Sequence, residues 1–243
     1  SDGHELEKLV WNEEGNALTD LERSVVRMIQ VRPHSAFAHY LLSHLLTRMY
    51  TKDPTDLGLL RKASDAAQQA IDLAPHNDYG YVAMASVMDI MGQSSKGVAL
   101  LESCQKAEIK ETWRTPFTQA RLQSDSLNHT EVLELLRRAL AHKDSPADVV
   151  VPYIVTILQS ASRGKDLIRE LTMWNESNGH QLYLQMIAAT HATENEYAEA
   201  HTFYQRVFAI DALNHEARVN DAIIMYRHLG DNLGAESNLR VVV

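Results

Sequence analysis

The amino-acid sequence predicts an all-α fold, and three observations support this prediction. Segments such as 65–73, 131–142 and 197–210 place their apolar residues at the helical period of about 3.6 residues. Glycine (10 residues) and proline (6) are scarce in this chain of 243 residues. Clear runs of alternating apolar and polar residues, which are typical of half-buried strands, are missing. Residues that favour helices therefore dominate the chain.

Three stretches of the chain look alike and indicate an internal repeat. They span residues 29–42, 71–84 and 209–222. In each stretch an amphipathic helix ends, a short turn with proline or a substitute follows, and another helix begins. Proline ends the first helix because it cannot donate a backbone hydrogen bond and because it restricts the preceding residue.

The unit that follows Pro75 shows the pattern most clearly. Its aromatic, large, small and turn residues come in a fixed order: Tyr81, Met84, Ala85, Met88, Gly92, Gly97, Leu101 and Cys104. This order resembles the tetratricopeptide repeat (TPR), a helix–turn–helix unit of 34 residues. Positions 8 and 20 of the repeat, here Ala85 and Gly97, must be small so that the two antiparallel helices can approach closely. Large residues at positions 4, 7, 11 and 24 fill the space between neighbouring units.

The other units follow in chain order. The opening segment, 2–33, can form a first pair with a short leading helix. The second unit, 36–75, keeps the repeat residues Leu42, Ser43, Leu46, Ala66, Ala70 and Pro75. Pro33 and Pro75 are 42 residues apart, and the excess over 34 predicts an enlarged loop between its two helices at 51–58. The third unit is 78–110.

The last four units match the repeat unevenly. The fourth, 112–144, keeps Ala120, Leu136 and Ala139, and the fifth, 146–178, keeps Val151, Ile154, Val155, Leu158, Leu171 and Trp174. The sixth, 180–212, keeps Leu184, Ile187, Ala188, Tyr197, Ala200, Tyr204, Val207 and Ala212. The seventh, 214–243, keeps Val219, Ala222, Tyr226, Gly230, Ala235 and Leu239, if the turn before it is one residue longer.

The resemblance implies a right-handed α-solenoid (superhelix) of about seven TPR-like antiparallel helix pairs, in one domain over residues 1–243. A related α-solenoid class or a generic helical bundle is the alternative. The chain stops at three valines with no evident polar cap. The last helix could therefore pack on a partner or on a second copy, or the segment could belong to a longer protein.

The charge and composition of the chain exclude several classes of partner. The formal net charge is −9, whereas non-specific nucleic-acid binding needs many lysines and arginines, so we expect no nucleic-acid partner. No run approaches the roughly 18 apolar residues of a membrane span, so we expect no membrane insertion. We expect a cytoplasmic location, or a periplasmic or secreted one if a leader was removed before Ser1.

The residues of the chain give little support for catalysis, for a metal or for a cofactor. His34, His39 and His44 lie five residues apart, which on a helix separates successive rings by about 140°, so they cannot readily converge on one ion. Residues 162–165 satisfy S-x-x-K by letter but lack the accompanying motifs. Cys104 occupies a packing position. We therefore predict no catalytic residue, no metal ligand and no cofactor.

The resemblance instead implies a binding surface. In TPR arrays the first helices of successive pairs line a concave groove, to which positions 2, 5, 9, 12 and 13 point. We predict that twelve residues at such positions bind a partner, although a solvated side chain is the alternative for any one of them. They are Phe37, Tyr40, His44, Thr47, Arg48, Tyr79, Val82, Ser86, Asp89, Asn220, Arg227 and His228.

The functional hypothesis is a non-catalytic scaffold that binds a peptide or a partner protein in this groove. Some TPR proteins grip chaperone C-termini with lysines and asparagines, but the corresponding positions here are Tyr40, His44, Val82 and Ser86, so that role is not expected. The alternative is a regulatory or ligand-sensing TPR domain of a longer protein, such as a cyclase or a transcription regulator. A homodimer through the uncapped C-terminal helix is a further expectation.

Overall fold

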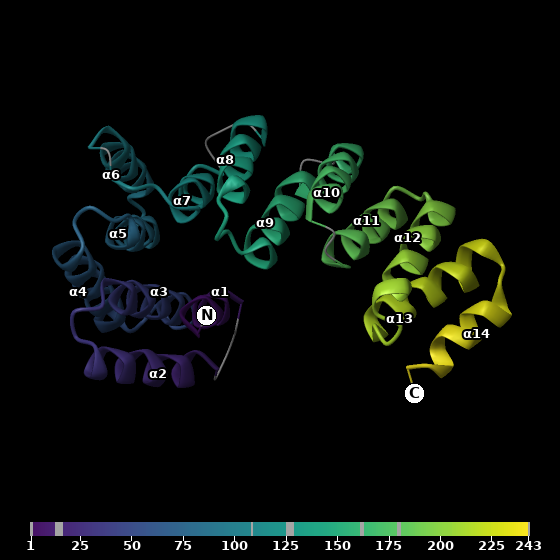
Figure 1. Ribbon diagram of the computed structural model, residues 1–243, viewed down its shortest axis with the longest axis horizontal. Helices are drawn as coiled ribbons and strands as arrows, with labels where there is room; N and C mark the ends of the chain where they lie inside the picture. Colours follow the sequence, from purple (N-terminus) through teal and green to yellow (C-terminus); the bar gives the residue numbers. More distant parts are fainter. Residues whose placement is uncertain are drawn as a thin grey trace. The chain divides into compact units, whose positions relative to one another are not determined.

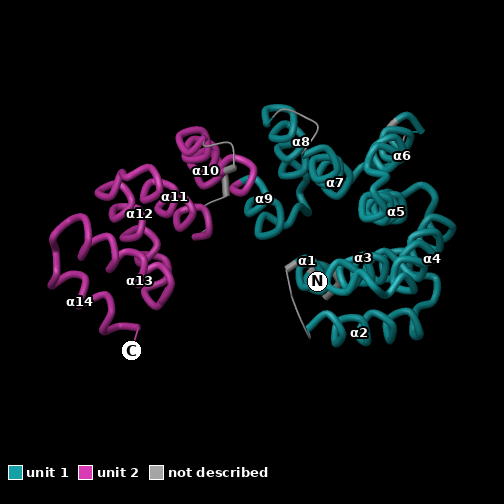
Figure 2. Tube along the Cα trace, turned by 180° about the vertical axis from the view of Figure 1, so that it is seen from behind, with its two compact units in different colours: residues 1–154 teal, residues 155–243 magenta. Residues whose placement is uncertain are grey.

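The structure, a computed structural model, describes residues 2–12, 17–107, 109–124, 129–160, 163–178 and 181–242. Within these ranges the chain forms fourteen α-helices and one π-helical turn, and no strand (Figure 1). The predicted all-α fold is confirmed. The contacts divide the chain into two compact units, Ser1–Ile154 and Val155–Val243, which Figure 2 shows in different colours. We call them unit 1 and unit 2.

Unit 1 contains the first eight helices and the start of the ninth. They are α1 (Asp2–Asn12), α2 (Ala17–Val31), α3 (Ala36–Lys52), α4 (Leu57–Leu73), α5 (Tyr79–Ile90), α6 (Ser94–Lys106), α7 (Arg114–Leu122), α8 (His129–Ala141) and α9 (Ala147–Ser160). Helix α3 packs on α4, α5 on α6, and α7 on α8, as helix pairs require. The main apolar cluster joins Val10 of α1 and Val25 of α2 to Leu41 of α3 and Leu101 of α6.

Unit 2 contains the end of α9 and the remaining helices. They are α10 (Gly164–Asn178), α11 (Gln181–Thr193), α12 (Tyr197–Ile210), α13 (His215–Ile224), the π-helical turn η1 (Met225–Leu229) and α14 (Asn232–Arg240). Helix α11 packs on α12, and α13 on α14. The apolar cluster of this unit joins Ala188 and Tyr204 of one pair to Ala217 and Ile224 of the next. The second of these pairs thus covers an apolar face of the first.

Close approach of helices explains the small residues of the repeat. A Cβ atom added at Gly97 would lie 2.9 Å from the carbonyl oxygen of Ala85, so positions 20 and 8 do touch in this pair. Gly80 is more constrained still. A Cβ atom there would lie only 2.4 Å from the backbone nitrogen of Ile71, because α5 crosses the end of α4 at this point.

The turn between two paired helices uses the left-handed backbone conformation at repeat position 15. Gly92 and Gly230, the two glycines that the repeat predicts there, both have φ of 72°. In the pair formed by α11 and α12 the same position is Asn195, with φ of 64°. Asparagine tolerates this conformation better than most residues with a side chain, so it can replace glycine in the turn.

The prediction of an enlarged loop at 51–58 is wrong. Helix α3 continues to Lys52 and α4 begins at Leu57, so only four residues separate them. The extra length lies in the helices, which have 17 residues each, whereas α5 has 12 and α6 has 13. The side chain of Asp56 accepts a hydrogen bond from the backbone N–H of Gly58 at 2.9 Å and so caps the first turn of α4. This cap allows the helix to begin at Leu57, only three residues after Pro54.

Replacing Gly80 with alanine is expected to lower the free energy of unfolding of unit 1 by about 1–3 kcal/mol. The new methyl group must push α4 and α5 apart, and this cost exceeds the gain of about 1 kcal/mol that alanine has over glycine inside a helix. Urea denaturation followed by circular dichroism measures the change. Ser95→Ala, at an exposed position of α6, is the control and should have little effect. A Gly80→Ala protein as stable as wild type would contradict the close approach.

Candidate partner-binding surfaces

Five of the twelve residues predicted to line the groove are buried. Tyr40 and Val82 have no exposed surface, and His44, Ser86 and Thr47 are at most 6% exposed. All five belong to α3 and α5 in unit 1. In this structure the chain itself covers the predicted groove side of these helices, so a partner could reach these residues only if that cover moved. Their role in partner binding stays a prediction.

Helix α1 forms a large part of this cover. The ring of Trp11 lies 4.6 Å from the ring of His44 and packs edge-on against Phe117 of α7 at 5.5 Å. Val10 is buried, and its backbone carbonyl accepts a hydrogen bond from the guanidinium of Arg48 on α3. One face of α1 therefore lies on α3 and meets α7.

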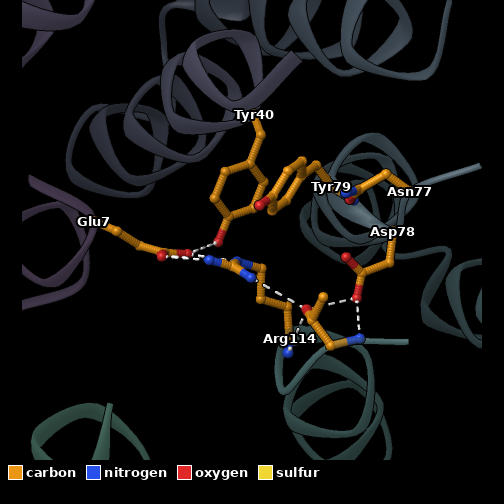
Figure 3. A network of polar contacts seen from close by, with 7 residues as sticks. Glu7, Tyr40, Asn77, Asp78, Tyr79 and Arg114 are labelled. Carbon is orange, nitrogen blue, oxygen red and sulfur yellow. Dashed lines mark hydrogen bonds and ion pairs between the residues drawn. The ribbon is translucent and has the colours of Figure 1, made fainter. Parts of the chain in front are cut away.

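A buried ion pair joins α1 to α7. Arg114 donates from Nε to Oε1 of Glu7 at 2.6 Å and from Nη2 to Oε2 of the same carboxylate (Figure 3). Both side chains are 3% exposed. The hydroxyl of Tyr40 donates a third hydrogen bond to Glu7 at 2.7 Å. Burial, and then the carboxylate of Glu7, raise the pKa of Tyr40, so this phenol stays protonated as a donor.

Asp78 at the start of α5 places Arg114. Its Oδ2 accepts hydrogen bonds from the backbone N–H of Thr112 at 2.8 Å, from the hydroxyl of Thr112 at 2.7 Å and from that of Thr115 at 2.9 Å. Arg114 in turn donates from Nη1 to the hydroxyl of Thr112 at 3.1 Å (Figure 3). The carboxylate thus fixes the first turn of α7, from which the guanidinium reaches Glu7.

Aromatic rings surround this guanidinium. Its central carbon lies 4.8 Å from the ring centre of Tyr79, 5.0 Å from Trp113, 5.4 Å from Tyr40 and 5.9 Å from Phe37. Cations are attracted to the faces of such rings, most strongly where water is excluded. Three of these rings belong to predicted groove residues, so the structure does bring Phe37, Tyr40 and Tyr79 together.

His44 is a neutral imidazole in a positively charged pocket. Burial is the main cause that lowers its pKa to about 3, and Arg121, Arg114 and Arg48 lower it further, in that order. Its Nε2 has no hydrogen-bond partner among the residues that the structure describes. We call the site lined by His44 and these three arginines, and filled by Glu7 and Trp11, the arginine pocket.

The other predicted polar residues of α3 and α5 bond within the chain. The hydroxyl of Thr47 donates to the carbonyl of Ser43 at 2.8 Å, and that of Ser86 to the carbonyl of Val82 at 3.1 Å. Asp89 is half-buried and accepts from the hydroxyl of Ser94 at 2.6 Å.

The remaining predicted residues are accessible and lie in unit 2. Asn220 is half-buried, whereas Arg227 and His228 are exposed. The ring of His228 stacks on that of Tyr197, with ring centres 3.7 Å apart. The partner-binding role of these three residues also stays a prediction.

The last helix pair of the described chain exposes an apolar face. Ile223 is 45% exposed, Tyr226 65% and Leu239 44%. Together with Arg227, Glu236 and Arg240 they line a groove of about 760 Å³ between α13, η1 and α14. We call these six residues the stacking face.

A repeat position explains the exposure of Leu239. Leu239 occupies position 24 of the last pair, whereas the buried Ala222 and Met225 are the equivalents of Ala188 and His191, because the π-helical turn adds one residue before Gly230. The residue at position 24 of the preceding pair, Tyr204, is 2% exposed. The following pair covers the preceding one through Ala217 and Ile224. The stacking face is therefore the surface that a further helix would cover.

Glu7, Trp11, Arg114 and Arg121 are not among the residues predicted from the sequence. The spacing of Glu7 and Trp11 was a usable signal, because residues four apart lie on one face of a helix. Arg114 directly follows Trp113 in a weakly matching unit, and nothing local shows that it lies opposite Glu7.

The candidate nucleophiles and metal ligands of the sequence do not form a reactive site in the described part of the chain. Cys104 is buried, which raises its pKa to about 11 and disfavours the thiolate. Ser162, of the S-x-x-K stretch, lies outside the described residues. His34 is exposed, His39 lies 3.1 Å from the carbonyl oxygen of Pro33, and His44 is buried, so the three do not meet. No cluster of three metal-ligating side chains occurs within the described ranges. Nor is any helix there long and apolar enough to cross a membrane.

Comparisons with known proteins identify the fold. No family model and no curated protein sequence matches the chain. Among solved structures, the human IFIT1 dimer with PPP-AAAA is 14% identical, with a TM-score of 0.51 over 94% of this chain and 55% of that one. Pseudomonas aeruginosa PilF is 14% identical, with a TM-score of 0.52 over 87% of this chain and 92% of that one. This chain spans about half the length of the IFIT1 chain.

A weaker likeness is to YrrB, described as a TPR protein with an unusual peptide-binding site. It is 12% identical, with a TM-score of 0.36 over 90% of each chain. The helical repeats of this chain have the fold of TPR solenoid proteins, as the repeat pattern predicted.

Proposed function

We propose that this protein is a non-catalytic scaffold that binds partner proteins, and that the stacking face of unit 2 is a docking surface. The exposure of Leu239, at a repeat position that is buried in the preceding pair, carries this proposal together with the exposure of the neighbouring Ile223 and Tyr226. Contiguous apolar surface rimmed by polar residues often marks an interaction site. Asn220 and His228, which the repeat pattern places with Arg227 in the predicted groove, are proposed as further contacts, because they are accessible.

The occupant that best fits the stacking face is the same face of a second copy. A twofold axis brings one patch against itself, so the apolar residues of each copy cover those of the other. The rim carries both signs of charge, Arg227 and Arg240 beside Glu236. Within one copy Arg240 pairs with Glu236 at 2.6 Å, so these two charges largely cancel and two copies of the face can approach with little repulsion.

The double substitution Tyr226→Asp with Leu239→Asp is expected to abolish this association. Wild type should dimerise with a micromolar dissociation constant, and the variant should bind itself more weakly by at least about tenfold, because two charges per copy would be buried. Size-exclusion chromatography with light scattering, over a range of protein concentrations, measures the change.

Leu213→Asp is the matched control. Leu213 is 66% exposed in the same unit but lies in the turn before α13, away from the stacking face, so this variant should dimerise like wild type. A wild-type chain that stays monomeric at high concentration, or a double variant that still dimerises, would refute the assignment to a second copy.

The same exposure favours a second candidate, a regulatory or ligand-sensing TPR domain of a longer protein. In that case a further helix pair would cover Tyr226 and Leu239. The complete coding sequence distinguishes the two proposals, since an attached catalytic or DNA-binding domain supports only the second.

The non-catalytic part of the proposal is supported by the state of Cys104. Its thiol is buried and its raised pKa keeps it protonated near neutral pH, so it is a poor nucleophile.

A further inference from the structure

Three arginines hold α1, and each contacts a different chemical feature of it. Arg114 forms the bidentate pair with the carboxylate of Glu7. Arg48 donates to the backbone carbonyl of Val10. The guanidinium of Arg121 lies 5.3 Å from the ring centre of Trp11. A carboxylate, a carbonyl in the last turn of a helix and an indole ring are thus recognised together.

These three features follow from the local structure of one short helix. Glu7 and Trp11 are four residues apart and so share a helix face. Val10 lies in the last turn of α1, where backbone carbonyls have no partner inside the helix. The negative end of the helix dipole also points there, which favours a nearby arginine. Any helix with a carboxylate one turn before an aromatic residue, and ending soon after it, presents the same set.

The charges of the arginine pocket are unusual for this protein. The chain as a whole has a net charge of −9, yet the charges of Arg48, Arg114 and Arg121 all lower the pKa of His44. Glu7 supplies the carboxylate that pairs with Arg114, and the negative charge of Asp89 attracts the positive charge of Arg121. Without α1, Arg114 would lose the carboxylate of Glu7 that pairs with it. It would then attract an acidic ligand.

We propose that the arginine pocket is a receptor for a partner helix that carries a carboxylate one turn before an aromatic residue, and that α1 is its resident occupant. This proposal rests on the scaffold function and names the chemistry of a partner for unit 1. The partner helix replaces α1 and repeats its contacts with Arg114, Arg48 and Arg121. A partner helix must displace α1, because α1 fills the pocket. Since α1 belongs to the same chain, it competes with the partner at a high effective concentration.

A peptide of residues 2–12 serves as the probe in the test. It is labelled and titrated into the full chain carrying Glu7→Gln with Trp11→Ala, which weakens the resident helix. The peptide should bind this variant more tightly than it binds wild type, by at least about tenfold, because the resident competitor is removed. Fluorescence anisotropy measures the affinity.

A second peptide, with Glu7→Gln, is the matched control. It keeps the length and the indole ring but loses the charge that Arg114 pairs with, so it should bind the variant protein more weakly by about tenfold or more. Equal binding of the two peptides would overturn the carboxylate assignment. Absence of binding to a variant that retains its helical circular dichroism would show that α1 is a permanent part of unit 1.

Native-state hydrogen exchange of the wild-type protein covers the case in which the variant fails to fold. If α1 leaves the pocket while unit 1 stays folded, its amides exchange about a hundredfold faster than those in the middle of α3. Equal exchange rates in α1 and α3 would overturn the proposal.

The outcomes also separate this proposal from that of the stacking face. A dimer that is lost on Glu7→Gln but kept on Tyr226→Asp with Leu239→Asp would identify the occupant as α1 of a second copy and overturn the partner-helix assignment. A monomeric wild type that binds the peptide would refute the stacking-face dimer alone.

Discussion

Replacing Arg114 with alanine is expected to lower the free energy of unfolding of unit 1 by about 3–5 kcal/mol. The substitution removes the counter-ion of the Glu7 carboxylate, which is 3% exposed and keeps the hydrogen bond from the hydroxyl of Tyr40. A buried carboxylate that loses its counter-ion keeps the cost of desolvation and loses the compensating attraction. The substitution also removes a cation from the centre of four aromatic rings.

Urea denaturation measures this change. Two of the three tryptophans, Trp11 and Trp113, lie in unit 1, so fluorescence in a Trp174→Phe background reports on that unit. Arg138→Ala is the control. Arg138 pairs with Glu111 at 3.0 Å but is 43% exposed, so its loss should cost less than about 1 kcal/mol.

A double variant separates the ion pair from its individual charges. Replacing Glu7 and Arg114 together with methionine removes both buried charges and roughly keeps their volume. Such replacements are often nearly neutral for stability, so this protein should be much more stable than Arg114→Ala. If Arg114→Ala costs no more than Arg138→Ala, the pair is not a buried one in solution.

Acid is expected to destabilise unit 1 through His44. The pKa of His44 is about 3 in the folded protein against a reference value of 6.5. Between these values the unfolded chain binds a proton on His44 and the folded protein does not. Above pH 6.5 His44 therefore does not lower the free energy of unfolding. As the pH drops from 6.5 towards 3, this free energy falls by about 1.4 kcal/mol for each pH unit.

His44→Phe is expected to remove this contribution. Phenylalanine keeps a ring against Trp11 and Tyr40, and Nε2 of His44 has no hydrogen-bond partner in the described part of the chain, so stability at pH 7 should change little. Denaturation of both proteins between pH 4 and 7 gives the difference in the free energy of unfolding, which should shift in favour of the variant as the pH falls. The substitution leaves groups far from this pocket unchanged, so their contributions cancel in the difference.

His34→Gln is the control, because His34 is exposed and its loss should leave the pH dependence unchanged. If the wild-type and His44→Phe curves run parallel from pH 7 to pH 4, His44 is not held neutral by burial.

Most of the fold followed from the sequence because the signals of the repeat are local. The spacing of apolar residues sets which face of each helix is buried, and Gly92 and Gly230 mark turns because they adopt positive φ without a steric cost. The error at 51–58 was also local. The motif around Pro54 looked like a loop, whereas Asp56 caps the next helix and Leu57 already belongs to it.

The site was predicted less completely, and the stacking face shows why. The repeat pattern predicts Tyr226 and Leu239 as core residues that a neighbouring pair covers, whereas in the structure both are exposed and line the groove. A repeat position predicts burial only where the next pair is present, and the sequence pattern of one unit does not contain that condition.

The sequence by itself determined the helical repeat, the turn positions and the helix faces that carry Phe37, Tyr40 and His44, because each depends on residues within one or two turns. Only the tertiary structure decided that this side of unit 1 is filled. Glu7 and Arg114 are 107 residues apart in the chain, and they meet because successive helix pairs curve α7 back towards α1. That curvature sums many small packing angles, and no short stretch of residues encodes it.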